Sequence, residues 1–101
     1  MDTDNIVRIE LDNQGRLLIK PATKKFTMIY RTASEVHWDQ NFESLYSPMP
    51  RDWSYQQWFE HIIEVTKDCG CELLITSETE WQNISEDLKS QILASCNKRL
   101  L

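Results

Sequence analysis

Glycine, proline and long apolar runs are scarce in this sequence. It has two glycines and three prolines among 101 residues. Two glycines cannot build a glycine-rich phosphate loop, and neither a Gly-x-Ser-x-Gly elbow nor a His-Glu-x-x-His helix occurs. No apolar stretch reaches the roughly 20 residues of a membrane span, and the acidic first residues lack the features of a signal peptide. We therefore expect a cytoplasmic protein with no catalytic motif, no cofactor and no membrane contact.

What is present is the composition of a globular domain. Hydrophobic residues make up 41% of the chain and aromatic residues 10%, which is enough apolar surface for one core. A chain of this length has no room for separate catalytic and regulatory parts. We therefore treat residues 1–101 as a single domain.

Negative charge exceeds positive charge, and the excess lies in the second half of the chain. The net charge is −5; residues 1–53 carry seven Lys or Arg against eight Asp or Glu, whereas residues 54–101 carry four against eight. Such a field repels nucleic acid and attracts basic partners. The alternative interpretation is a solvated acidic surface that only keeps the protein soluble.

The clearest predicted element is a helix over residues 54–69. Ser54 and Gln57 have the spacing of a capping box, and Gly70 follows as a stop signal. One face of this helix is apolar and consists of Tyr55, Trp58, Phe59, Ile62, Thr66 and Cys69. The opposite face is polar and consists of Gln57, Glu60, His61, Glu64 and Asp68. The apolar face predicts a sheet that covers it.

Alternating apolar residues predict four strands before this helix. Residues 6–12 and 16–20 have the pattern of a hairpin, with Gly15 placed for the left-handed position of a G1 bulge. Residues 26–31 and 36–39 alternate in the same way. The apolar side is expected to contain Val7, Ile9, Leu11, Phe26, Met28, Tyr30, Val36 and Trp38.

The remaining segments complete the expected fold. Residues 39–53 lack periodicity and are expected to form an irregular loop. Residues 71–76 are an apolar run that predicts a fifth strand, and residues 85–99 predict a second helix that Ser85 caps. The fold class is therefore α+β: a four-stranded antiparallel meander and a fifth strand, with the first of two helices packed on one sheet face.

Cys69-Gly70-Cys71 is a candidate redox or metal motif. Zinc takes four ligands, and the other candidates, Cys96, His37 and His61, lack the paired spacing of a structural site. A helix-to-strand junction explains the triplet more simply, because Gly70 ends the helix. We therefore expect reduced cysteines and no metal.

Two histidines are the candidates for acid–base chemistry. His61 lies on the polar helical face, and His37 lies between Glu35 and Asp39. Either would need a nucleophile facing it in a pocket, and the sequence contains no motif that supplies one. We therefore expect that the protein is not an enzyme.

Aromatic residues beside an acidic surface are typical of a protein-binding patch. The residues expected to contact a partner are Glu60, Glu64, Asp68, Tyr46, Met49, Trp53 and Trp81. We predict a binding module for a basic protein partner, and a symmetric homodimer is a further expectation.

Two other interpretations of these aromatic residues stay open. Large aromatic side chains can simply fill the rim of a small core. Alternatively, residues 39–53 form a lid over an aromatic pocket, and the protein binds a small molecule.

The sequence also resembles a family of small bacterial immunity proteins that accompany polymorphic toxins, with look-alikes among orphan proteins encoded by mobile gene cassettes. The similarity lies between about residues 6 and 76, in the segments Ile9–Asp12, Gly15–Leu17, Ile29–Arg31, Val36–Asp39 and Trp58–Ile63. The resemblance implies an α+β domain that inhibits a cognate toxin by binding it, without a cofactor. It carries over no inhibitory residues, and it includes neither the Cys-Gly-Cys triplet nor the second helix.

Overall fold

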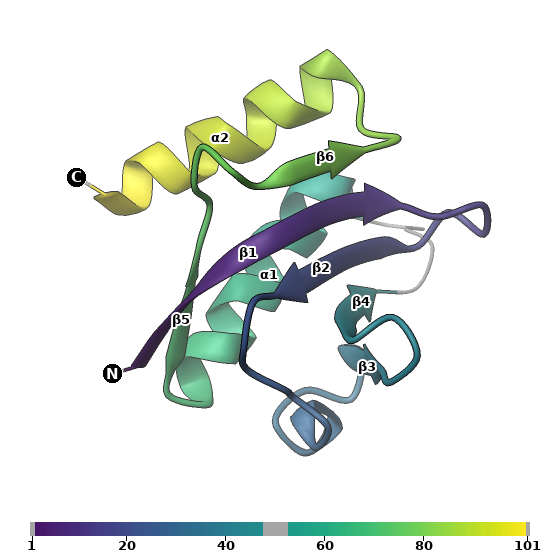
Figure 1. The fold of residues 1–101 in the computed structure, drawn as a ribbon, viewed down its shortest axis with the longest axis vertical. Helices are drawn as coiled ribbons and strands as arrows, with labels where there is room; N and C mark the ends of the chain where they lie inside the picture. The colour runs from purple at the N-terminus through teal and green to yellow at the C-terminus, as the bar shows by residue number, and fades with distance from the viewer. Residues whose placement is uncertain (1, 48–52, 101) are drawn as a thin grey trace.

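A computed structural model describes residues 2–47 and 53–100, with the backbone alone over residues 96–100. The predicted α+β class is confirmed: one mixed six-stranded sheet packs with two helices (Figure 1). In chain order the elements are β1 (Asp2–Leu11), β2 (Leu17–Pro21), the 3₁₀ helix η1 (Ile29–Arg31), β3 (His37–Asp39), β4 (Ser44–Ser47), α1 (Tyr55–Asp68), β5 (Cys71–Leu74), β6 (Glu80–Gln82) and α2 (Glu86–Leu100). None of the helices in the described part of the chain is long and apolar enough to cross a membrane.

The sheet combines antiparallel and parallel pairing. Its strand order is β3-β4-β2-β1-β5, and β6 pairs with β1 as well. Strands β5 and β6 run parallel to the first and second parts of β1, whereas β2, β4 and β3 continue the sheet with antiparallel pairing. Helix α1 lies behind the sheet in Figure 1, and α2 runs beside β6.

The predicted hairpin is confirmed, with one correction. Gly15 adopts φ 79°, the left-handed conformation expected for it. The register shifts between Ile6 and Arg8, which marks a β-bulge at Val7. Val7 is therefore 39% exposed, and Ile6 takes the buried position in its place. The prediction that Val7 lies in the core is wrong. A bulge inserts one residue into the strand, so the residues before it point to the opposite sheet face from the one that simple alternation predicts.

Residues 26–31, predicted as a strand, form instead a turn that ends in η1. The two buried side chains, Phe26 and Ile29, are three residues apart, which is the spacing of a tight turn. Met28 and Tyr30, expected on the apolar side of a strand, are exposed. The alternating pattern was therefore misleading at this point.

A buried carboxylate diverts the chain at the start of this segment. Asp4 Oδ2 accepts hydrogen bonds from the backbone N–H groups of Thr23 at 2.9 Å and Lys24 at 2.8 Å. Backbone donors that bind a side chain are lost to strand pairing. The segment after β2 consequently leaves the sheet.

Part of the predicted irregular loop is a strand. Strand β4 lies within residues 39–53 and pairs with both β2 and β3. Its Leu45 and Ser47 are buried in the sheet, so this part of the segment builds the core and is not a lid. The strand near residues 36–39 is confirmed as β3, but it pairs with β4 and not with residues 26–31, which form no strand. The predicted order of a simple meander is corrected accordingly.

Helix α1 supplies the other half of the core, as predicted. Its buried residues are Phe59, Ile62, Ile63, Val65 and Thr66. These pack with side chains from the strands and from α2, including Ile6, Ile9, Leu17, Ile19, Leu45, Leu73 and Ile92. Cys69, predicted on the same apolar face of α1, is exposed, because the helix ends at Asp68. The short strand β6 was not predicted, and the strand predicted over residues 71–76 ends at Leu74.

Candidate functional site: an acidic and aromatic surface on helix α1

The start of α1 fixes the position of an exposed tryptophan. The Gln57 N–H donates to Ser54 Oγ at 3.2 Å, and the Ser54 N–H donates to Gln57 Oε1 at 2.8 Å, so the predicted capping box is confirmed. Trp53 precedes the cap and packs on Trp58 in the second turn, with ring centroids 4.9 Å apart. This pairing is a hydrophobic staple. Trp53 nevertheless remains 42% exposed.

A shallow depression of about 450 Å³ opens beside this tryptophan. Its lining consists of Trp53, Gln57, Glu60, His61 and Glu64. The lining thus combines an aromatic face with two carboxylates and contains neither Lys nor Arg. Its chemistry suits a cationic side chain, which a carboxylate and an indole face both attract.

A histidine links this helix to the segment before β3. His61 Nε2 lies 2.6 Å from Glu35 Oε1, and the His61 ring meets the Trp53 ring edge-on at 5.2 Å. The backbone N–H of Glu35 and the His61 side chain together hold the pKa of the Glu35 carboxyl below its ordinary value. Glu35 therefore adds a third carboxylate next to the depression.

Glu60 also joins the two helices. The buried Ser95 hydroxyl on α2 donates to Glu60 Oε1 at 2.6 Å, and Gln56 Nε2 donates to Ser95 Oγ at 3.0 Å. Glu60 consequently has a structural role as well as a place in the depression. Substitutions at Trp53 and Glu64 leave this contact between the two helices in place.

Comparison with known proteins places the chain in a family. Residues 4–79 match the sequence pattern of the family described as Integron Cassette Protein Hfx_Cass5. The chain belongs to the Hfx_Cass5 family of integron cassette proteins. A solved structure from the mobile metagenome of North West Arm Sewage Outfall, that of Integron Cassette Protein Hfx_Cass5, is 34% identical, with 96% of this chain and 98% of that chain covered and a TM-score of 0.49. No curated protein matches the chain.

The family assignment confirms the mobile-cassette part of the predicted resemblance. It gives no support to the immunity part. The matched residues extend from β1 to the connection before β6, so they include α1 and the depression on it.

The structure of this Hfx_Cass5 family member brings together only some of the residues predicted to contact a partner. Trp53, Glu60 and Glu64 line the same depression. Asp68 is exposed in the last turn of α1 and does not line it. Met49 lies outside the described residues.

The other two predicted contact residues lie elsewhere. Tyr46 projects from the opposite side of β4 to the buried Leu45, stacks on His37 at 5.1 Å and carries the Arg16 guanidinium 4.6 Å above its ring. Trp81 is half-buried on β6, with the Lys89 amine 5.4 Å from its ring centre. Neither belongs to the surface on α1.

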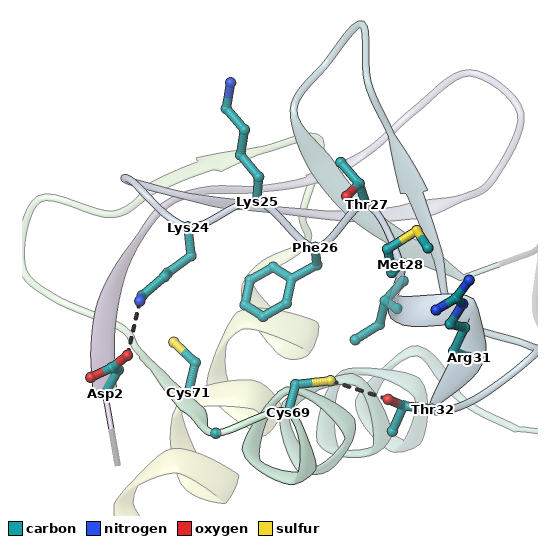
Figure 2. A pocket seen from close by; sticks show the side chains of 12 residues that line it. Asp2, Lys24, Lys25, Phe26, Thr27, Met28, Arg31, Thr32, Cys69 and Cys71 are labelled. Atoms are coloured by element: carbon teal, nitrogen blue, oxygen red, sulfur yellow. Dashed lines mark hydrogen bonds and ion pairs between the residues drawn. The ribbon is translucent and has the colours of Figure 1, made fainter.

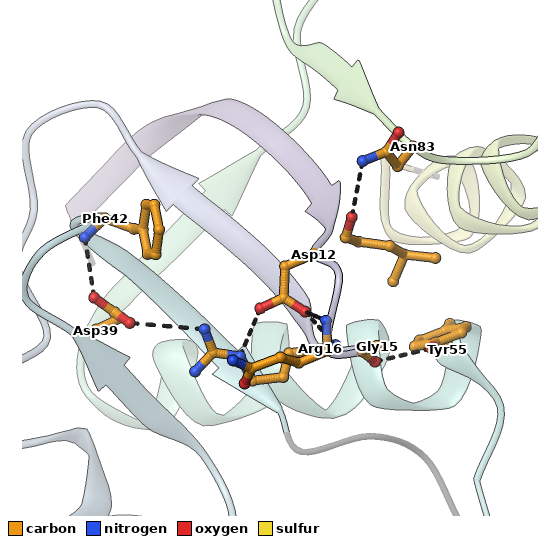
Figure 3. Close-up of polar contacts among 9 residues, drawn as sticks. Asp12, Gly15, Arg16, Asp39, Phe42, Tyr55 and Asn83 are labelled. Carbon is orange, nitrogen blue, oxygen red and sulfur yellow. Dashed lines mark hydrogen bonds and ion pairs between the residues drawn. The ribbon is translucent and has the colours of Figure 1, made fainter.

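The neighbourhood of His37 is a structural network. Arg16 Nε donates to Asp12 Oδ2 at 2.6 Å, and its guanidinium also lies 3.9 Å from Asp39 (Figure 3). Tyr55 at the start of α1 donates its hydroxyl to Gly15 O at 2.8 Å. These contacts fix the β1–β2 turn against α1 and β3.

The contact between Glu35 and the surface on α1 is one that the sequence did not indicate. The sequence pattern predicts Glu35 only as a strand neighbour of His37, yet it bonds to His61, 26 positions further along the chain. No local pattern reports such a distant pair. His61, a candidate general base from the sequence, has a carboxylate and two tryptophan side chains as its neighbours.

Cys69 and Cys71 are both free thiols. The Cys96 side chain lies outside the described part of the structure. Among the described residues, no group of three or more His, Cys, Asp or Glu side chains is arranged to hold a metal ion. Reduced, metal-free cysteines stay a prediction that native mass spectrometry can test.

Proposed function

We propose that this cassette protein is a binding module for a basic segment of a protein partner, and that the depression on α1 is the contact site. The observation that carries the proposal is the exposed Trp53 ring in the same depression as Glu60 and Glu64. A lysine or arginine over an indole face gains about 0.5–2 kcal/mol. Neighbouring carboxylates add charge-assisted hydrogen bonds.

The site is preorganised for such a contact. Trp53 is held between Trp58 and His61, and the capping box sets the direction in which the chain enters the helix. A side chain that is already ordered loses little conformational entropy when a partner binds. Trp53 therefore has the character of an interface anchor.

The proposal defines the partner by its chemistry. A toxin with a basic surface is one such partner, and inhibition of a toxin is the specific form that the immunity resemblance implies. The family description names no toxin, so the proposal depends only on the acidic and aromatic character of the α1 surface.

Binding of a hexa-arginine peptide, measured by calorimetry at low ionic strength, tests the proposal. We expect saturable binding to the wild-type protein, weakened about tenfold by Trp53→Ala because the cation loses its aromatic contact. Glu64→Gln should also weaken binding and should reduce its dependence on salt.

Glu78→Gln is the matched control, because it removes one carboxylate from an exposed turn outside the depression. If attraction by net charge alone explained binding, Glu64→Gln and Glu78→Gln would have equal effects. Equal effects, or an absence of peptide binding, would contradict the proposal.

Capture from the native host addresses the natural partner. A tagged wild-type protein is compared with the Trp53→Ala, Glu64→Gln double variant, which leaves the Glu60–Ser95 contact between the helices intact. We expect a basic protein to be retained by the wild type and lost from the double variant. Equal retention by both would place the contact elsewhere on the molecule.

A further inference from the structure

A cavity of about 500 Å³ lies at the opposite end of α1 from Trp53, between residues 22–32 and the junction of α1 with β5. Figure 2 shows Phe26 and the Cys71 thiol directed into this space, with Cys69 beside them. The volume lies within the roughly 300–1,000 Å³ that is usual for small-molecule pockets. The cavity includes both thiols of the Cys-Gly-Cys triplet, for which the surface on α1 provides no role.

The floor of the cavity is apolar. Phe26, Ile29 and Cys71 are buried side chains that line it. Burial raises the pKa of the Cys71 thiol, which keeps that group neutral. Met28 adds a flexible thioether at the rim, a group that adapts to differently shaped apolar ligands.

The rim of the cavity carries three basic side chains, Lys24, Lys25 and Arg31, against the single carboxylate of Asp2, although the protein as a whole has a net charge of −5. Lys24 and Arg31 lie on opposite sides of it in Figure 2. The Lys24 amine forms an exposed ion pair with Asp2 at 3.0 Å. Arg31 is exposed and lines the cavity, and within residues 2–47 and 53–100 its guanidinium is in none of the ion pairs.

The wall that carries these basic groups is fixed before any ligand binds. Asp4 accepts two backbone N–H groups and the Thr23 hydroxyl at the start of the 22–32 segment. At its other end, the Thr32 hydroxyl lies 3.3 Å from the Cys69 sulfur (Figure 2). A wall that is ordered in advance lowers the entropic cost of binding.

We propose that this cavity binds a small organic carboxylate with an apolar body. The carboxylate pairs with Arg31, whose planar guanidinium suits two parallel hydrogen bonds. The apolar body covers Phe26, Ile29 and Met28. This site is separate from the surface on α1 and does not depend on the function proposed for that surface. The sequence predicts, as an alternative, a small-molecule pocket under residues 39–53, but β4 in that segment is part of the core. The present proposal therefore assigns small-molecule binding to the cavity beside residues 22–32.

The probe is 2-naphthoate, with calorimetry to measure its affinity and iodoacetamide to report its position. Cys69 is an exposed thiol on the cavity wall, so a bound naphthoate should slow its alkylation, followed at the Cys69 peptide by mass spectrometry. Arg31→Gln should weaken the affinity about tenfold, because it removes a charge-assisted pair from an exposed side chain without disturbing the core.

Three controls separate this site from nonspecific binding. Lys89→Gln removes one positive charge from α2, outside the cavity, and should leave the affinity for naphthoate unchanged. Acetate, which lacks the apolar body, and 2-naphthylmethanol, which lacks the charge, should each bind more weakly than naphthoate. Failure of naphthoate to bind, equal affinity in Arg31→Gln, equal binding of the alcohol, or unchanged alkylation of Cys69 would each overturn the proposal.

Discussion

The acidic surface on α1 and the basic-rimmed cavity are held in place by different means. The first lies on a capped helix of 14 residues whose other face buries Phe59 and Ile62. The second depends on an irregular segment, and one carboxylate, Asp4, binds the backbone at its start. Many buried apolar side chains together stabilise the position of α1, so each contributes only part of the free energy. The 22–32 segment instead depends strongly on one side chain, the hydrogen-bond acceptor Asp4. The two sites should therefore respond differently to substitution and to acid.

The two regions also differ in the sign of the charge on their side chains. Carboxylates lie beside Trp53, whereas Lys24, Lys25 and Arg31 line the cavity that contains Phe26. A basic peptide and an organic carboxylate should consequently select different regions. Binding of one probe should leave the affinity of the other unchanged.

The largest expected effect is the loss of both sites together when the shared core is broken. Ile62 on α1 is completely buried, so Ile62→Asp places a carboxylate in the core without a partner and removes apolar packing. We expect a loss of about 5 kcal/mol or more, which is comparable with the whole stability of a small domain. Far-UV circular dichroism should show an unfolded chain.

Asp68→Lys is the control for this substitution, because Asp68 is an exposed residue near the end of the same helix. It should change the free energy of unfolding by no more than about 0.5 kcal/mol. A soluble Ile62→Asp protein that melts cooperatively would show that the burial of α1 against the sheet is not what holds the fold together.

The same contrast explains which parts of the fold were predictable. Helix α1 has a start signal, a stop signal and an apolar face; the two signals agree with the structure, and the face agrees except at its last residue, Cys69, which is exposed. Residues 26–31 alternate as a strand does, but the groups that direct them away from the sheet belong to Asp4, about 20 positions earlier. A sequence pattern reports local preferences and cannot report such a distant hydrogen bond.

The two sites follow the same rule: residues close together on one helix were predictable, and residues brought together by the fold were not. Glu60 and Glu64 were predictable together because they lie four residues apart on one helix face, whereas Trp53 was predicted only as an aromatic residue beside a connection. Tyr46 and Trp81 were grouped with them by residue type alone, and the strands carry them elsewhere. The cavity escaped prediction because it needs the fold to bring residues 24–32 to the end of α1.

A smaller and more local effect is expected at Asp4. Asp4→Ala leaves the backbone N–H groups of Thr23 and Lys24 without their acceptor, at a cost of about 2–4 kcal/mol. Hydrogen exchange at these two amides should accelerate, and the affinity for naphthoate should fall. Binding of hexa-arginine to the folded protein should stay unchanged.

Asp2→Ala is the matched control, since Asp2 is an exposed carboxylate whose described partner is the Lys24 amine. Exposed ion pairs contribute little, so we expect no measurable change in unfolding. If Asp4→Ala were as harmless as Asp2→Ala, the 22–32 segment would be held by something other than the buried carboxylate.

The smallest effect is the dependence of stability on acid pH. Burial by itself raises the pKa of Asp4, but the hydrogen bonds from Lys24, Thr23 and Asn5 outweigh it and hold this pKa below its ordinary value. A carboxyl whose pKa is lower in the folded state stabilises the fold fully above its unfolded pKa of about 4. This contribution is lost as the pH falls through the folded pKa, because the unfolded state then binds more protons.

Urea unfolding at a series of pH values tests this difference between the two regions. Asp4→Asn cannot titrate, so the stability gap between wild type and this variant should be largest above about pH 5 and should close in stronger acid. Glu35→Gln on the acidic surface should show a smaller gap, since the Glu35 side chain is 42% exposed and solvent screens its pairing with His61. A gap for Asp4→Asn that stays constant down to pH 2, or one that Glu35→Gln exceeds, would show that the buried carboxylate is not the more strongly stabilising of the two.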